Sequence, residues 1–134
     1  MLHDYYQQRG GEDESAEQDL AVLRKHGHEV RFHTMHNDEI AGYDAFEKAA
    51  LWFRPTWSTK SFRKVRAAIE TFRPDVAHVQ NFFPLLSPAV YYACREAGIP
   101  VVQTLRNYRI LAPCALLVRG DRVCERCIQG SLWQ

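Results

Sequence analysis

The chain has 134 residues, which is the size of one ordinary domain and long enough to bury a hydrophobic core. Hydrophobic residues make up 46% and charged residues 25%, a composition that excludes a disordered chain. The net charge is +1, no apolar run approaches the ~20 residues of a membrane span, and the start lacks a signal-peptide pattern, so we expect a cytoplasmic protein without a nucleic-acid partner.

Strands and helices are expected to alternate along the chain. Helices are indicated by apolar residues that recur every three or four positions, and strands by short apolar or alternating runs. The predicted elements, in chain order, are a strand at 1–6, a helix that ends at Gly27, a strand at 28–34, an irregular connection at 35–60, a helix at 61–72, a strand at 75–79, a helix at 87–97 and a strand at 101–105.

Local signals set the ends of some of these elements. Ser61 is expected to cap the helix at 61–72, and Arg73 before a proline is expected to end it. Within the irregular connection, one helical turn is expected near 46–53. The alternation as a whole predicts an α/β fold, a Rossmann-like parallel sheet with helices on both faces and right-handed crossovers.

Three segments follow predicted strands at the edge where ligands bind to a parallel sheet. The Gly10-Gly11 pair lets N–H groups at a helix start approach an anion such as a diphosphate, although such a pair is more often a simple turn. Asn81 either faces sugar hydroxyls or caps its turn. Arg106 and Asn107 either meet a phosphate or carboxylate or belong to a solvated loop.

Together these segments resemble the N-terminal domain of family 4-like glycosyltransferases. The matching runs are YQQRGGED at 6–13, HGHEV at 26–30, PDVAHVQNFFPLLSP at 74–88 and the segment 100–113 with its cysteine-rich sequel. The resemblance implies one half of a GT-B fold, in which two Rossmann-like domains face each other across a cleft. The first domain grips the acceptor, the second holds most of a nucleotide-sugar donor, and the sugar is transferred with retention at its anomeric carbon.

The resemblance also implies roles for single residues. Gly10 and Gly11 would approach the donor diphosphate. The residues implied to line the acceptor side are His78, Asn81, Arg106 and Asn107. Many relatives carry histidine where this chain has Gln80 and again where it has Arg106. Because arginine stays protonated at any accessible pH, Arg106 cannot act as a base, and we assign no catalytic residue.

Other features of the family have no counterpart in the sequence. Its first strand normally begins several apolar residues before His3, and its second domain, with paired glutamates that hold the donor, would follow Gln134. We therefore expect residues 1–134 to form an incomplete acceptor-side domain that is inactive alone, unless a separate chain supplies the C-terminal nucleotide-sugar domain. The alternative is a non-catalytic glycan- or nucleotide-binding module of the same fold.

Three of the four cysteines cluster as C-x9-C-x2-C at Cys114, Cys124 and Cys127. A C-x2-C pair is familiar from zinc knuckles, but a closed zinc site needs four ligands, so reduced thiols are favoured over zinc as a cofactor. Cys94 lies on the apolar face of a predicted helix and is expected in the core. A small zinc-dependent structural protein is the remaining alternative.

Aromatic and basic residues are interleaved between Trp52 and Arg66. This pattern predicts either peripheral contact with a membrane surface or an ordinary helix whose Phe62 is in the core and whose charges are solvated. Membrane contact at the inner face would suit an enzyme with a lipid-linked acceptor. The partners implied by the resemblance are thus a nucleotide-sugar and a glycan or lipid-linked acceptor, as in polysaccharide biosynthesis.

Overall fold

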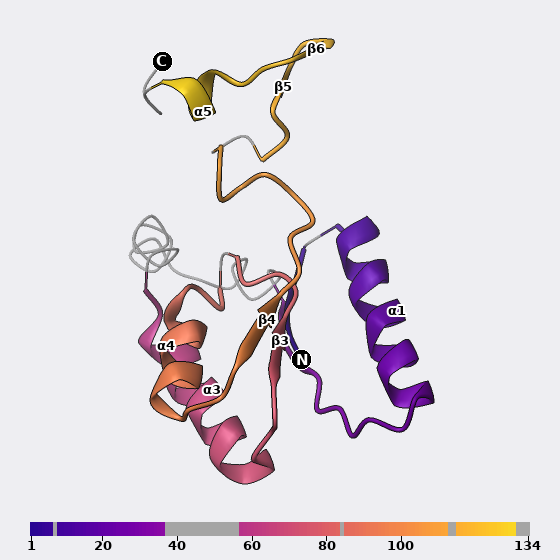
Figure 1. The fold of residues 1–134 in the computed structure, drawn as a ribbon, viewed down its shortest axis with the longest axis vertical. Helices are drawn as coiled ribbons and strands as arrows, with labels where there is room; N and C mark the ends of the chain where they lie inside the picture. Colours follow the sequence, from indigo (N-terminus) through magenta and orange to yellow (C-terminus); the bar gives the residue numbers. More distant parts are fainter. Residues whose placement is uncertain (7, 37–56, 84, 113–114, 131–134) are drawn as a thin grey trace. The chain divides into compact units, whose positions relative to one another are not determined.

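The computed structural model describes residues 1–6, 8–36, 57–83, 85–112 and 115–130 (Figure 1). The chain divides into two compact units, Met1–Thr104 and Leu105–Gln134.

The first unit is built on a four-stranded parallel sheet in the order β2-β1-β3-β4. The strands are β1 (Leu2–Tyr5), β2 (His33–His36), β3 (Ala77–Val79) and β4 (Val101–Gln103). β1 is central, with Leu2 opposite His33 on one side and Val79 on the other. The carboxyl ends of all four strands therefore meet at one edge, which is the edge that the sequence predicts as the site.

Helices cover both faces of this sheet. α1 (Gly11–Lys25) lies on one side of the strands, and α3 (Thr59–Phe72) and α4 (Ala89–Glu96) lie on the other (Figure 1). This arrangement confirms the predicted α/β fold, a Rossmann-like parallel sheet with helices on both faces. Among the described residues, no helix has the length and apolar character needed to cross a bilayer.

The two faces of the sheet are packed differently. Between the sheet and the α3–α4 pair lies an apolar cluster that includes Leu2, Met35, Val65, Ile69, Val79, Leu86, Val90, Ala93 and Cys94. The layer between the sheet and α1 is polar and holds the hydrogen bonds His3 Nε2 to Asp13 Oδ1 (2.8 Å), Tyr5 Oη to Glu17 Oε1 (3.1 Å) and Gln80 Nε2 to Asp19 Oδ2 (2.7 Å). The expectation that Cys94 lies in the core is confirmed.

The start of α3 differs from the prediction. The cap is Ser58, whose Oγ accepts a hydrogen bond from the Ser61 N–H at 3.2 Å, so the helix begins before Ser61. Ser61 is a residue of the helix, its side chain is fully buried, and its hydroxyl donates to the Leu85 carbonyl oxygen at 2.6 Å. The end agrees with the prediction, because Arg73 adopts a left-handed conformation with φ 49°.

The strands are shorter than predicted, and the second is shifted. Residues 28–32 are not a strand, whereas β2 extends to His36. Among the described strands, β2 pairs with β1 alone, and that pairing starts where Leu2 meets His33, so no described strand lies beside residues 28–32. The predicted turn near 46–53 lies outside the described residues.

The second unit contains small elements that the sequence did not suggest. β5 (Val118–Arg119) and β6 (Arg122–Val123) form an antiparallel hairpin, and α5 (Arg126–Gln129) follows. Gly120 in the hairpin turn has φ 67°, a conformation that favours glycine. Among the described hydrophobic side chains of this unit, Ala112 is the buried one.

Candidate functional site

The turn between β1 and α1 is open above its two glycines. Gly10 is the N-cap of α1 and is extended, with φ −133° and ψ 179°, so its backbone does not require glycine. A Cβ atom built on Gly10 or Gly11 would meet no other atom within 4 Å. The glycines therefore leave free space at the start of a helix, where backbone N–H groups and the helix dipole favour an anion.

Asp13 fixes the shape of this turn. Its Oδ2 accepts a hydrogen bond from the Gly10 N–H at 3.0 Å, and its Oδ1 lies 2.8 Å from His3 Nε2. The Asp13 and His3 side chains are both fully buried. Asp13 was not predicted as a site residue, although an acidic residue three positions after a helix N-cap is a capping signal.

Other carboxylates surround the same turn. The first turn of α1 carries Glu12 and Glu14 besides Asp13, and Tyr6 Oη donates to Glu12 Oε2 at 3.1 Å. Acidic side chains stabilise a helix start but repel an anionic ligand at the same place. The negative charge of Asp13 faces His3, whereas Glu14 is exposed to solvent.

The His78 side chain extends from β3 into a polar network. Its Nε2 lies 2.7 Å from Thr104 Oγ1 and 3.1 Å from Gln80 Nε2. Because the Gln80 amide nitrogen can only donate, His78 Nε2 acts as the acceptor and the ring proton belongs on Nδ1. The same Gln80 nitrogen also donates to Asp19 Oδ2 at 2.7 Å, which links the network to α1.

Asn81 joins the ends of β1 and β3. It is 8% exposed, and its Nδ2 donates to the Asp4 carbonyl oxygen at 2.8 Å and to that of Phe83 at 3.2 Å. Its Oδ1 accepts from the Phe83 N–H at 3.2 Å. These are the contacts of a turn cap, and a contact between Asn81 and an acceptor stays a prediction.

Gln103 ends β4 and makes a second group of polar contacts that was not predicted. Its Oε1 accepts from Tyr91 Oη at 2.5 Å, and its Nε2 donates to the carbonyl oxygens of Gln80 and Thr104 at 2.8 and 2.7 Å. Burial raises the pKa of Tyr91 to about 12, so its phenol remains a donor at neutral pH. A polar residue at the end of a short apolar strand is the signal that could have revealed it.

Arg106 and Asn107 belong to the second unit. Arg106 is exposed, and Asn107 Oδ1 accepts a hydrogen bond from the Arg109 N–H at 2.9 Å. The first unit thus brings the glycine turn, His78 and Asn81 onto one sheet, while the other two predicted acceptor-side residues are carried by a separate unit. Their roles toward an acceptor stay predictions.

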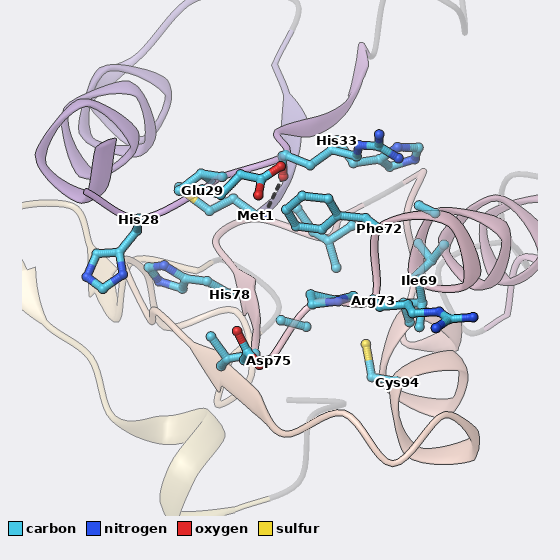
Figure 2. A pocket seen from close by; sticks show the side chains of 18 of the residues that line it. Met1, His28, Glu29, His33, Ile69, Phe72, Arg73, Asp75, His78 and Cys94 are labelled. Carbon is cyan, nitrogen blue, oxygen red and sulfur yellow. Dashed lines mark hydrogen bonds between the residues drawn. The ribbon is translucent and has the colours of Figure 1, made fainter. Parts of the chain in front are cut away.

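A cavity of about 350 Å³ lies at the opposite, amino-terminal edge of the same sheet (Figure 2). Met1, Phe72 and Cys94 are among the residues that line it, and the Met1 amino group donates to the Arg31 carbonyl oxygen at 2.8 Å. Burial lowers the pKa of that amino group and raises the pKa of the Cys94 thiol. This cavity was not predicted, and it is not at the edge where parallel sheets bind ligands.

The cysteine cluster is only partly within the described residues. Cys124 and Cys127 are reduced and half-buried, and Cys114 lies outside the described residues. In the part of the chain that the structure describes, no three or more His, Cys, Asp or Glu side chains are grouped to hold a metal ion. Zinc at the three cysteines stays a prediction.

One family model matches the chain, and it covers most of its length. The model is described as a glycosyl transferase 4-like domain and matches residues 10–130, a span that begins at the glycine turn and includes β2, β3 and β4. No curated protein and no solved structure matches the chain. On the extent of the family match, together with the parallel α/β sheet, this chain belongs to the glycosyl transferase 4-like domain family.

Proposed function

We propose that the chain is the acceptor-side half of a retaining glycosyltransferase that moves a sugar from a nucleotide-sugar to a glycan or lipid-linked acceptor. Membership of the family supports the transferase class. The observation that carries the proposal further is the open glycine turn at the start of α1, directly beyond the carboxyl end of β1. That is where sheets of this kind receive phosphate-containing ligands.

The donor diphosphate would meet the backbone N–H groups of the first turn of α1. Free space above Gly10 and Gly11 lets an anion come close to the backbone, and the helix dipole attracts it. Glu12 and Glu14 oppose this attraction, so we expect weak binding by this domain alone. In a complete enzyme, a second domain would supply most of the affinity for the donor.

The acceptor would lie beside the ends of β3 and β4. There His78 accepts hydrogen bonds through Nε2 within the first unit. Arg106 belongs to the second unit, and its guanidinium is of the kind that pairs with the phosphate group of a lipid-linked acceptor. No residue here is proposed as a base, because arginine stays protonated. One Rossmann-like domain supplies only one wall of a cleft, so the domain should be inactive until a nucleotide-sugar domain, for example on a separate chain, completes it.

The test is a calorimetric titration of the chain with UDP-, GDP- and ADP-sugars. We expect saturable binding of one of them, lost in Gly11→Val because the new side chain fills the open space. The matched control is Gln18→Val, which places the same side chain at an exposed position of α1. Gly11→Val should stay folded, since a Cβ at Gly11 meets no atom within 4 Å, and Gln18→Val should lose only the few tenths of a kcal/mol, roughly, by which valine is a poorer helix former than glutamine.

Two other outcomes would decide against the proposal. Binding that survives Gly11→Val would remove the glycine turn from the site. Glycan binding without any nucleotide-sugar binding, and without turnover when a nucleotide-sugar domain is added, would indicate a non-catalytic binding module of the same fold. The proposed location is the cytoplasm, with peripheral contact at the inner membrane face if the acceptor is lipid-linked.

A further inference from the structure

Three aromatic rings form a surface cluster where α3 begins beside α4. The Trp57 ring stacks on Phe62 with centroids 5.9 Å apart and meets Tyr92 at 5.2 Å in a T-shaped contact. Trp57 is 45% exposed and Tyr92 is 43% exposed. We call Trp57, Phe62 and Tyr92 the aromatic patch. Phe62 is half-buried and packs against the core, whereas the larger rings of Trp57 and Tyr92 gather beside it on the surface, and such a gathering indicates a contact with something else.

The aromatic patch is accompanied by positive charge. The Arg95 guanidinium lies 4.8 Å from the centroid of the Tyr92 ring. From Trp57 to Ile69 the chain carries no acidic residue, and its cations there are Lys60, Arg63, Lys64 and Arg66. Arg66 pairs with two glutamates, at 3.2 and 3.3 Å, but all three side chains are more than half exposed, so these pairs cancel little of the charge in water.

We propose that the aromatic patch and its cations dock on the surface of a membrane that contains anionic phospholipids. Tryptophan and tyrosine rings are amphipathic and favour the boundary between headgroups and acyl chains. Lysine and arginine beside them are attracted to the negative lipid surface. Trp57, Phe62 and Tyr92 thus supply an apolar contact, and Arg95 supplies positive charge directly beside it.

A second copy of the chain fits this surface less well. In a symmetric pair the same patch would meet itself, and the cations of α3 and Arg95 would face their own copies. Like charges at such an interface repel, whereas an anionic lipid surface neutralises them. The membrane is therefore the occupant that the charge distribution favours.

This inference adds a membrane-binding surface to the proposed function, in which the acceptor is lipid-linked. It rests on that proposed function only for the biological role of the membrane contact. Lipid binding needs neither donor nor acceptor chemistry, so it is measured separately. If no nucleotide-sugar binds, vesicle binding would still be expected, although its role would be unknown. If vesicles do not bind, the result of the nucleotide-sugar titration would be unaffected.

The test is flotation of the chain with vesicles of phosphatidylcholine, alone or mixed with phosphatidylglycerol. We expect binding to the mixed vesicles and little binding to phosphatidylcholine alone. The double variant Trp57→Ser and Tyr92→Ser should lower the partition coefficient about tenfold or more. Replacement of Arg95, the cation beside Tyr92, by glutamine should lower it about fivefold.

Matched controls come from the second unit, where Tyr108 is 52% exposed and Arg119 and Arg122 are also exposed. Tyr108→Ser, and glutamine at the two arginines, should leave vesicle binding unchanged. Equal binding to both kinds of vesicle, no binding, or losses as large in the controls would overturn the proposal. The chain could instead fail to float and form a concentration-dependent dimer that Trp57→Ser abolishes. That result would assign the aromatic patch to a second copy of the chain and would also overturn the proposal.

Discussion

His33, at the start of β2, has a side chain that is easier to bury neutral than charged. Burial lowers its pKa below the usual value, and repulsion by Lys64 and the Met1 amino group adds to the effect. Its Nε2 is buried and has no hydrogen-bond partner in the described parts of the chain, so a proton there would have no described acceptor to donate to. The folded state therefore resists protonation of this ring more than the unfolded state does.

Because the pKa of His33 is lowered in the folded state, the stability of the fold should depend on pH. Between the lowered pKa of His33 and about pH 6.5 the unfolded chain binds more protons, so the free energy of unfolding should fall as the pH falls through that window. His33→Gln should make that part of the curve flatter in urea unfolding at several pH values. His28→Gln, at an exposed imidazole, is the control. Equal slopes in the two variants would show that His33 is not the cause.

At the scale of elements, two serines at the start of α3 have different structural roles. Ser58 caps the helix at its surface, and Ser61 connects the helix to the Leu85 carbonyl in the core. Ser58→Ala should cost about 1 kcal/mol of unfolding free energy, the usual value for a lost N-cap. Ser61→Ala should cost about 1–3 kcal/mol, because it leaves a buried carbonyl without its donor.

Urea unfolding with an unchanged m-value would measure both losses. Thr71→Ala on the same helix is the control, because the Thr71 hydroxyl is exposed and donates only to Ala67 one turn before it. Its cost should stay below about 0.5 kcal/mol. If Ser61→Ala behaves like this control, the bond to Leu85 does not stabilise the fold.

These elements also show what the sequence could reveal. The order of strands and helices was predictable, because each has its own apolar period, and so was the end of α3 at Arg73. The cap at Ser58 was not predictable, because Ser58 and Ser61 carry the same capping group. Only the fold shows that the Ser61 hydroxyl donates to the Leu85 carbonyl oxygen instead. The shift of β2 depends on its register with β1, which no local pattern contains.

The location of the segments that form the candidate site was predictable, but their individual contacts were not. Motif order and spacing led to the glycine turn and to the segments after β3 and β4, and the family match covers all of them. The contacts of Asp13 with His3 and Gly10, and of Gln103 with Tyr91, join residues that are close only after folding. Asp13 carries a capping signal and Gln103 a polar strand end, but neither signal identifies the partner that folding brings to it.

At the scale of the whole molecule, the hydrophobic core belongs to one unit. Every residue of the buried apolar cluster lies within Met1–Thr104. The second unit exposes large apolar side chains at Leu105, Ile110, Leu116 and Val123, with 65% or more of each accessible. Stability of the chain should therefore reside in the first unit.

A chain that ends at Thr104 tests this expectation. It should unfold cooperatively, with a midpoint within about 4 °C of the full chain, a shift that corresponds to about 1 kcal/mol or less. Val65→Ala in the shortened chain is the control that must lower the midpoint, since Val65 is 2% exposed in the core. Broad, non-cooperative melting of the shortened chain would mean that the second unit contributes to the fold.

The position of β1 in the middle of the sheet affects how the chain is assembled during synthesis. β1 is made before both of its neighbours, which begin at His33 and Ala77, and parallel pairing needs both. Until β3 has left the ribosome, one edge of β1 and the apolar side of Leu2 remain uncovered. Contacts between such distant segments form slowly, so this edge stays open to pairing with other chains until β3 has emerged and docked.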